Sequence, residues 1–175
     1  MKHAIFITLV CSVLGACAGI GADNPPRPDS GNTEKVTMDD LNRLQGDNWQ
    51  GTLSYLNYGS DKRSTIPVKA TIKVLDKNGL LYAIQYPGEE QYNVKERLKL
   101  SSDGTRIDGY SITNREQAAD GTLVLTTEGK GRDDNRPAQI QIIYSVAADR
   151  FSIRKNVRFT NEEAYLNRNE YSFLR

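Results

Sequence analysis

The sequence IPVKATIKVLDKNG, residues 66–79, contains the pattern that decides the fold. Apolar side chains occupy every second position of its first nine residues: Ile66, Val68, Ala70, Ile72 and Val74. A period of two is typical of a half-buried β-strand, because successive side chains point to opposite faces. The Asn78-Gly79 pair accepts the positive φ of a tight hairpin turn, so a second strand is expected to return antiparallel to the first.

The same period runs from Trp49 to the end of the chain. Strands are expected at residues 49–55, 66–74, 80–86, 94–100, 106–112, 122–127, 140–146, 151–159 and 165–173, with a polar loop over 129–137. No helical segment between them is long enough for a parallel crossover. The sequence therefore predicts an all-β domain, an antiparallel meander of about 8 or 9 strands. Closure into a barrel would hide its edges, and the alternative is a two-sheet sandwich.

One short helix is expected before the first strand. Thr37 and Asp40 have the spacing of a capping box, and Leu41 and Leu44 form an apolar stripe on the turn that Gly46 ends. The predicted helix spans about residues 38–45. It is too short to be stable alone, so we expect it to close one end of the β structure.

The N-terminus predicts export. Lys2 is followed by an unbroken apolar run from Ala4 through Leu14, which is too short to cross a bilayer and is typical of a signal peptide. The run ends in Leu14-Gly15-Ala16-Cys17, which resembles the lipobox of bacterial lipoproteins. This resemblance implies that Cys17 is diacylated and becomes the new N-terminus. The alternative is an ordinary cleavage after Ala18 or Ala22, which would give a soluble periplasmic or secreted protein.

The expected organisation is a signal peptide over residues 1–16, a lipidated Cys17 with a disordered tether over 17–36, and a β-barrel domain over 37–175. The tether has no apolar periodicity and contains Pro25, Pro26 and Pro28. Ala18 follows the cysteine where an Asp would retain a lipoprotein in the inner membrane, so the resemblance implies an outer-membrane protein facing the periplasm or the cell surface.

The composition excludes several classes of function. The only histidine is His3 and the only cysteines are Cys11 and Cys17, so the exported domain would have no imidazole and no free thiol. Serine–histidine and cysteine–histidine catalysis, histidine-ligated haem and cysteine or histidine zinc sites are therefore not expected, and we predict no metal and no cofactor. The 23 basic and 22 acidic residues nearly cancel, which argues against nucleic acid as a partner.

A helix, a tryptophan at the start of the first strand, an up-and-down meander and an arginine-bearing last strand together resemble the calycins, the lipocalin-like barrels. In that superfamily the tryptophan packs against a basic side chain of the last strand. The resemblance therefore implies that Trp49 contacts Arg168 or Arg175 as part of the structure.

Candidate ligand-binding residues are polar side chains in register with apolar ones, because an unpaired polar group on a buried face is unfavourable. Glu96 is in register with Val94 and Leu98, and Lys155 with Ile153 and Val157. If these faces line a barrel, an amphipathic interior is expected to contain Tyr82, Tyr86, Glu96, Tyr144, Lys155, Asn167 and Asn169. The alternative is that Glu96 and Lys155 form a structural ion pair, and a β-bulge in either strand would reverse the register. The opposite face of the last two strands is expected to carry Arg154, Arg158, Arg168 and Glu170.

These observations favour a non-catalytic envelope lipoprotein that binds a small or lipid-like ligand in its barrel and reaches the membrane through its lipid anchor. The alternative is a structural or interaction module that docks on another envelope protein or on the cell wall. An enzyme using carboxylate or tyrosine chemistry ranks third among the hypotheses, because the sequence alone places no acidic residue beside a plausible catalytic partner.

Overall fold

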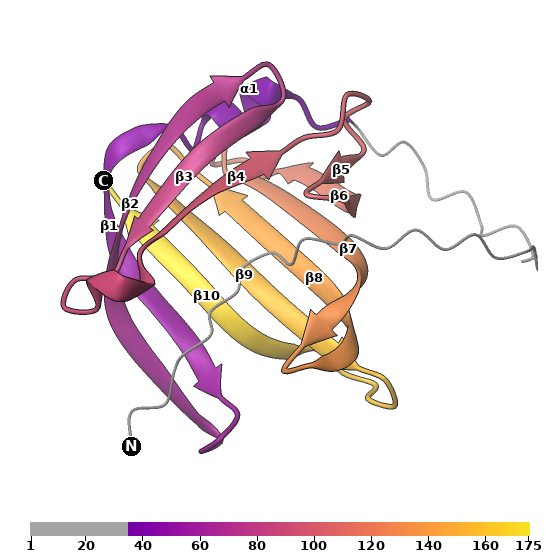
Figure 1. Cartoon of the computed structure of the whole chain (residues 1–175). Helices are drawn as coiled ribbons and strands as arrows, with labels where there is room; N and C mark the ends of the chain where they lie inside the picture. The colour runs from indigo at the N-terminus through magenta and orange to yellow at the C-terminus, as the bar shows by residue number, and fades with distance from the viewer. Residues whose placement is uncertain (1–34) are drawn as a thin grey trace, which may run out of the picture.

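The structure, a computed structural model, describes residues 35–175 (Figure 1). The expectations for the signal peptide, for Cys17 and for residues 17–34 of the tether lie outside these residues. The described elements are α1 (Met38–Asn42), β1 (Gly46–Asn57), β2 (Lys62–Asp76), β3 (Gly79–Gln85), the single-turn η1 (Glu90–Tyr92), β4 (Val94–Lys99), β5 (Arg106–Ile107), β6 (Tyr110–Gln117), β7 (Leu123–Asp133), β8 (Arg136–Val146), β9 (Arg150–Phe159) and β10 (Leu166–Leu174).

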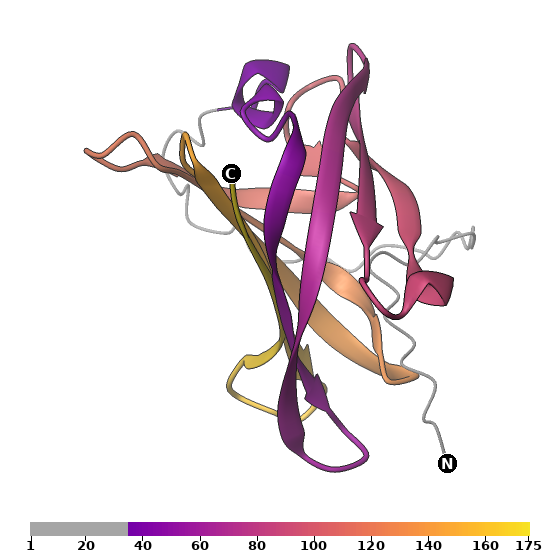
Figure 2. The same ribbon diagram turned by 90° about the vertical axis from the view of Figure 1, so that its left-hand side faces the viewer.

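The described strands form one antiparallel sheet that curls into a nearly closed barrel (Figures 1 and 2). Its order is β4-β3-β2-β1-β10-β9-β8-β7-β6-β5, so every strand pairs with its sequence neighbours except β4 with β5, and β1 pairs with β10. The two ends of this order meet at a seam, where Leu100 and Ile107 form an isolated antiparallel bridge. The all-β meander with a barrel-like sheet is thus confirmed, and the two-sheet sandwich is wrong.

The hydrophobic core extends along the barrel, and its aromatic side chains include a stacked layer at the end beneath α1. Phe151 pairs with Val146 on β8 and with Phe173 on β10, and the rings of Phe151 and Phe173 stack with centroids 4.6 Å apart. Leu41 and Leu44, from α1 and the turn after it, are buried against this layer. The amphipathic stripe that predicted the helix therefore closes this end of the barrel, as expected.

Trp49 organises the same end of the barrel. Its ring meets that of Phe151 edge-on with centroids 4.8 Å apart, and its Nε1 donates a hydrogen bond to the Leu44 carbonyl at 3.0 Å. The Arg175 guanidinium lies over the indole, 4.5 Å from the ring centroid. Arg175 is thus the basic partner of Trp49, and Arg168 is not.

Several boundaries differ from the sequence prediction. Asp108 and Gly109 both adopt positive φ and divide the expected strand 106–112 into β5 and β6, which raises the number of described strands to ten. The expected loop 129–137 is mostly strand, since β7 continues to Asp133 and β8 starts at Arg136. Gly129 is required there, because a Cβ at this position would lie 2.5 Å from the Tyr110 ring.

The N-terminal boundary of the domain also moves. Val36, assigned to the tether from the sequence, is buried in the core, and its N–H donates to the Gly104 carbonyl at 3.2 Å. The helix α1 is shorter than predicted and ends at Asn42. The Thr37 N–H donates to Asp40 Oδ2 at 3.0 Å, as the capping-box spacing predicts. Within residues 35–175, no helix has the length and apolar character that a membrane span requires.

Candidate ligand-binding site

A row of side chains from adjacent strands points into the barrel and brings polar groups into a lining that is otherwise largely apolar. Register pairs Thr127 with Ile142, Ile142 with Lys155, and Lys155 with Asn169. Asn169 in turn pairs with Tyr55 on β1. Because directly paired residues share one face of a sheet, Thr127, Lys155 and Asn169 lie on the same inner surface.

Two oxygen atoms in this row are buried without a hydrogen-bond partner. Thr127 is fully buried and Asn169 is 7 % exposed, and neither Thr127 Oγ1 nor Asn169 Oδ1 accepts or donates a hydrogen bond within residues 35–175. An unsatisfied buried polar atom costs about 1–3 kcal/mol, so such atoms are rare unless something else satisfies them. The row therefore retains hydrogen-bonding capacity toward the interior.

Lys155 connects the row to a second group, the rim cluster, formed by Tyr58, Asp133, Lys155 and Arg168. Lys155 Nζ lies 2.5 Å from Asp133 Oδ1, and Arg168 Nε lies 3.3 Å from Asp133 Oδ2. The Tyr58 hydroxyl donates to Asp133 Oδ2 at 2.7 Å. These residues come from the barrel end opposite α1. Two cations around one carboxylate leave the cluster with a net positive charge.

Opposing effects set the protonation of the rim cluster. Burial alone would raise the pKa of Asp133, but the hydrogen bond and charge of Lys155, with help from Tyr58 and Arg168, hold this pKa below its usual value. Burial, and then the hydrogen bond to Asp133, raise the pKa of Tyr58. At neutral pH Asp133 is therefore ionised while Tyr58 keeps its proton.

A third group, the seam cluster, contains Tyr82, Glu96, Asp108 and Tyr144. The Tyr82 hydroxyl donates to Glu96 Oε2 at 2.7 Å, and Asp108 Oδ1 accepts the Lys99 N–H at 2.8 Å. Burial, reinforced by the negative charge of Glu96, raises the pKa of Asp108 to about 6. Burial and then the negative charge of Asp108 raise the pKa of Tyr144. The sequence-predicted Tyr82, Glu96 and Tyr144 thus belong to one polar region of the interior.

The interior tyrosines are suited to binding rather than to covalent chemistry. Tyr86 and Tyr171 approach each other across the interior, with their hydroxyl oxygens 2.7 Å apart. Burial raises the pKa of Tyr82, Tyr86, Tyr144 and Tyr171. Neutral phenols donate and accept hydrogen bonds, whereas a nucleophile would require the phenolate.

A β-bulge between Asn167 and Asn169 corrects two sequence predictions. Asn167 was expected inside the barrel, but its side chain accepts a hydrogen bond from Arg63 Nη2 at 3.1 Å on the exposed surface. Arg168 was expected on the outer face, but it joins the rim cluster and lies over the Tyr58 ring at 4.4 Å. Asn169 is inside, as predicted. Outside, Arg154 Nε pairs with Glu170 Oε2 at 3.0 Å, a cross-strand pair on the expected face.

The structure also corrects the proposed pairing of Glu96 with Lys155. Glu96 accepts its hydrogen bond from Tyr82, whereas Lys155 pairs with Asp133. Sequence reasoning missed Asp133 because it lay in the expected loop. The inward alternation of Leu123, Leu125 and Thr127 reaches Asp133 if the strand is simply extended. No comparable signal identified Asp108, because turn residues have no periodicity.

The two ends of the barrel interior differ in polarity. Next to α1, an apolar cavity of about 20 Å³ lies between side chains that include Leu44, Ile72, Leu98 and Phe173. Towards the opposite end the row at Thr127 and then the rim cluster add polar groups beside buried apolar residues such as Val157 and Phe159. Hydrogen-bonding groups are thus concentrated towards the second end of the interior, and the cavity lies among apolar side chains at the first.

Fold and interior together define a small antiparallel β-barrel that is closed by a helix at one end and carries a cluster of buried polar groups towards the other. No family model matches the chain, and no curated protein matches it. Among solved structures, the chain is similar to Rv2717c from M. tuberculosis, with a TM-score of 0.54 and 10 % sequence identity. The match covers 79 % of this chain and 96 % of that one. At this identity, the likeness concerns the fold alone.

Proposed function

We propose that the protein is a non-catalytic envelope lipoprotein whose barrel binds a small or lipid-like ligand through a polar group. The observation that carries the proposal is the pair of buried, unsatisfied oxygens, Thr127 Oγ1 and Asn169 Oδ1, on either side of Lys155. A ligand that donates a hydrogen bond to these oxygens would offset their desolvation. The positive rim cluster beside them favours a ligand that also carries an acceptor or an anionic group.

Native mass spectrometry of the protein purified from its source tests this function. We expect a bound small molecule in the wild-type protein, and we expect Asn169→Leu and Lys155→Met to reduce its occupancy at least roughly tenfold, as the loss of one or two buried polar contacts predicts. Each variant is also unfolded with urea, so that loss of the ligand is distinguished from loss of the fold.

Asn167→Leu and Lys130→Met are the matched controls. Asn167 lies on the same strand as Asn169 but on the outer surface, and Lys130 is exposed on β7. Both controls should retain the ligand. The proposal fails if the purified protein contains no small molecule, or if Asn169→Leu and Lys155→Met raise stability without changing the ligand content.

A further inference from the structure

Positive charge gathers on the outer surface of β2, β3 and β4. This surface, called here the basic hairpin face, carries six exposed cationic residues: Lys69, Lys73, Lys77, Lys95, Arg97 and Lys99. Two carboxylates contact them, since Asp47 lies 3.8 Å from Lys73 Nζ and Asp76 lies 2.7 Å from Arg97 Nη2. Asp108, which accepts the Lys99 N–H, is a third acid beside this face, so six cations and three acids leave a net charge of +3, although the whole chain has a formal net charge of only +1.

The strand register places these cations on one side of the sheet. Lys73 pairs with Leu81, and Leu81 pairs with Arg97, so the three residues form one row across the three strands. Thr71, Ala83 and Lys95 form the next row. The uncharged side chains of β3 therefore separate two lines of positive charge, one on β2 and one on β4.

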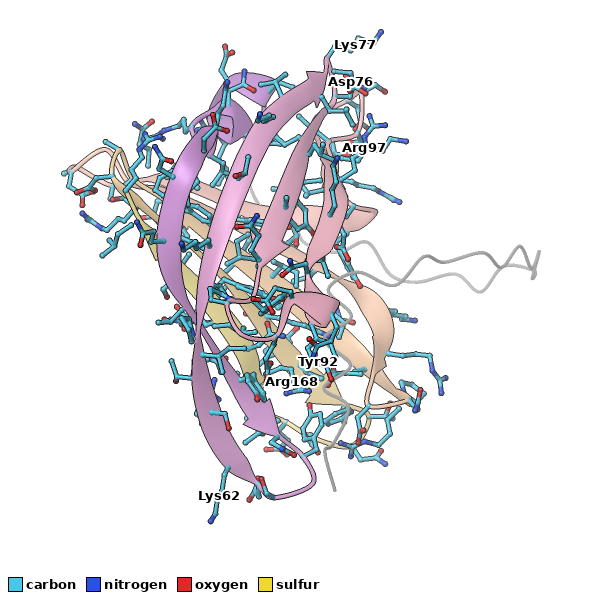
Figure 3. All side chains as sticks on the ribbon, turned by 60° about the vertical axis from the view of Figure 1, so that its left-hand side comes forward. Lys62, Asp76, Lys77, Tyr92, Arg97 and Arg168 are labelled. Atoms are coloured by element: carbon cyan, nitrogen blue, oxygen red, sulfur yellow. The ribbon has the colours of Figure 1, made fainter. Side chains whose placement is uncertain are left out.

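The hairpin between β2 and β3 adds an exposed apolar tip. Val74 is 45 % exposed and Leu75 is 48 % exposed, which makes them two of the three exposed large hydrophobic residues within 35–175. The register shifts between Val74 and Asp76, so Leu75 has no partner residue on β3. Figure 3 shows Lys77 at the outermost point of this hairpin, with Asp76 and Arg97 below it. Apolar side chains thus project from the rim of the barrel between cations.

We propose that the basic hairpin face docks on the surface of an anionic phospholipid bilayer, with Val74 and Leu75 entering the headgroup region. Lysine and arginine side chains are attracted to anionic headgroups, and apolar side chains gain from leaving water at the same interface. A soluble polyanion would satisfy the cations but would offer nothing to Val74 and Leu75. The combination of an apolar tip with flanking cations therefore favours a lipid surface over a nucleic acid or an acidic protein.

The path of the chain agrees with this orientation. Asn78, in the hairpin turn, accepts the Leu100 N–H at 2.9 Å, and the following loop holds Val36 through the Gly104 carbonyl. Lys35 and Val36, where the described chain begins, therefore lie at the same rim as the hairpin. A lipid on Cys17 would be connected to the domain at the end that carries the apolar tip.

Vesicle co-sedimentation tests the proposal on the expected processed chain, residues 17–175, carrying Cys17→Ser, so that neither the apolar run at 4–14 nor an acyl group contributes. The vesicles contain equal parts of phosphatidylglycerol and phosphatidylethanolamine, and vesicles of phosphatidylcholine alone serve as the uncharged reference. We expect binding to the anionic vesicles that weakens with salt. The triple variant Lys69→Gln, Lys77→Gln, Lys95→Gln should lower the partition coefficient roughly 100-fold, and Val74→Asn with Leu75→Asn roughly tenfold.

Matched controls remove an equal number of charges, or one exposed apolar side chain, elsewhere. The first, Lys62→Gln, Lys130→Gln, Arg132→Gln, changes three exposed cations near the opposite end of the barrel, and the second, Leu174→Asn, changes the third exposed apolar residue. Both should bind like the parent. The proposal is wrong if the parent prefers neither vesicle, if the first control loses as much binding as the triple variant, or if polyglutamate competes fully while Val74→Asn with Leu75→Asn has no effect.

Discussion

Asp133 is the residue on which the polar end of the barrel depends. It is the common partner of Lys155, Arg168 and Tyr58, and its side chain is only 8 % exposed. Asp133→Asn would leave two cations facing each other without a counter-charge, so we expect a loss of about 3–5 kcal/mol in the free energy of unfolding. Lys155→Met should cost less, about 1–2 kcal/mol, because Arg168 and Tyr58 still satisfy the carboxylate. Urea denaturation measures both values, and equal losses would contradict this ranking.

Asp108 should make the domain less stable as the pH rises. An ordinary ion-paired acid has the opposite effect, because its pKa is lowered by folding. Its pKa is about 6 in the folded protein and near 3.8 when exposed, so between these values the folded state binds more protons than the unfolded state. Stability should therefore fall by about 2 kcal/mol as pH rises from 4 to 6. Asp108→Asn should remove this fall and raise stability at pH 7, since its amide oxygen can still accept the Lys99 N–H.

Asp61→Asn is the control for this effect. Asp61 also has a positive φ, 53°, but it is exposed, and asparagine tolerates the same backbone conformation. Chemical denaturation across the pH range should give parallel curves for Asp61→Asn and the wild type. A slope between pH 4 and 6 that persists in Asp108→Asn would show that another group causes it.

At the scale of elements, closure of the barrel depends on how closely β1 approaches β10. A Cβ at Gly51 would lie 1.9 Å from the Ser172 carbonyl oxygen, so no side chain fits without separating the strands. We expect Gly51→Ala to lower the free energy of unfolding by more than about 3 kcal/mol. In Gly59→Ala the nearest atom lies 3.3 Å from the new Cβ, and the change should stay within about 0.5 kcal/mol. Thermal unfolding followed by circular dichroism compares the two.

Strands were predictable from the sequence because their signal is local and repeated. The alternation at residues 66–74 reappears as the inward Val68, Ala70 and Ile72 of β2. The bulge at Arg168 was not predictable, because an extra residue in one strand is fixed by pairing with its neighbours and leaves no mark on the alternation. This single bulge moved Asn167 outside and Arg168 inside, so the candidate site was only partly correct even where the strand was right.

The pairing of polar side chains in the candidate site depends on contacts between residues that are far apart in the sequence. The partners of Lys155 and Glu96 depend on which side chains meet across the barrel, and several strands supply acceptable partners. Tyr58 and Asp133, 75 positions apart in the sequence, meet only because β1 and β7 end at the same rim. Composition still narrowed the chemistry, since residues 35–175 contain neither histidine nor cysteine and therefore support no imidazole or thiol reaction.

For the whole molecule, the lipobox resemblance and the basic hairpin face lead to one prediction about membrane association. A lipid anchor and a basic surface are two separate attachments, and stable binding generally requires more than one. The wild-type protein should stay in the membrane fraction after a high-salt wash, because the acyl chains are insensitive to salt. In Cys17→Ser and in the combined variants, an ordinary cleavable secretory signal peptide replaces residues 1–16, so that the apolar run at 4–14 is removed. Cys17→Ser should then be retained only at low salt, through the basic hairpin face alone.

Combining Cys17→Ser with Lys69→Gln, Lys77→Gln and Lys95→Gln should then move the protein into the soluble fraction at any salt concentration. The same Cys17→Ser background with Lys62→Gln, Lys130→Gln and Arg132→Gln keeps the basic hairpin face and should behave like Cys17→Ser. Fractionation of cells with immunoblotting measures all four. If Cys17→Ser resists the high-salt wash as well as the wild type does, lipidation is not what holds this protein, because only a salt-insensitive attachment elsewhere in the chain could account for it.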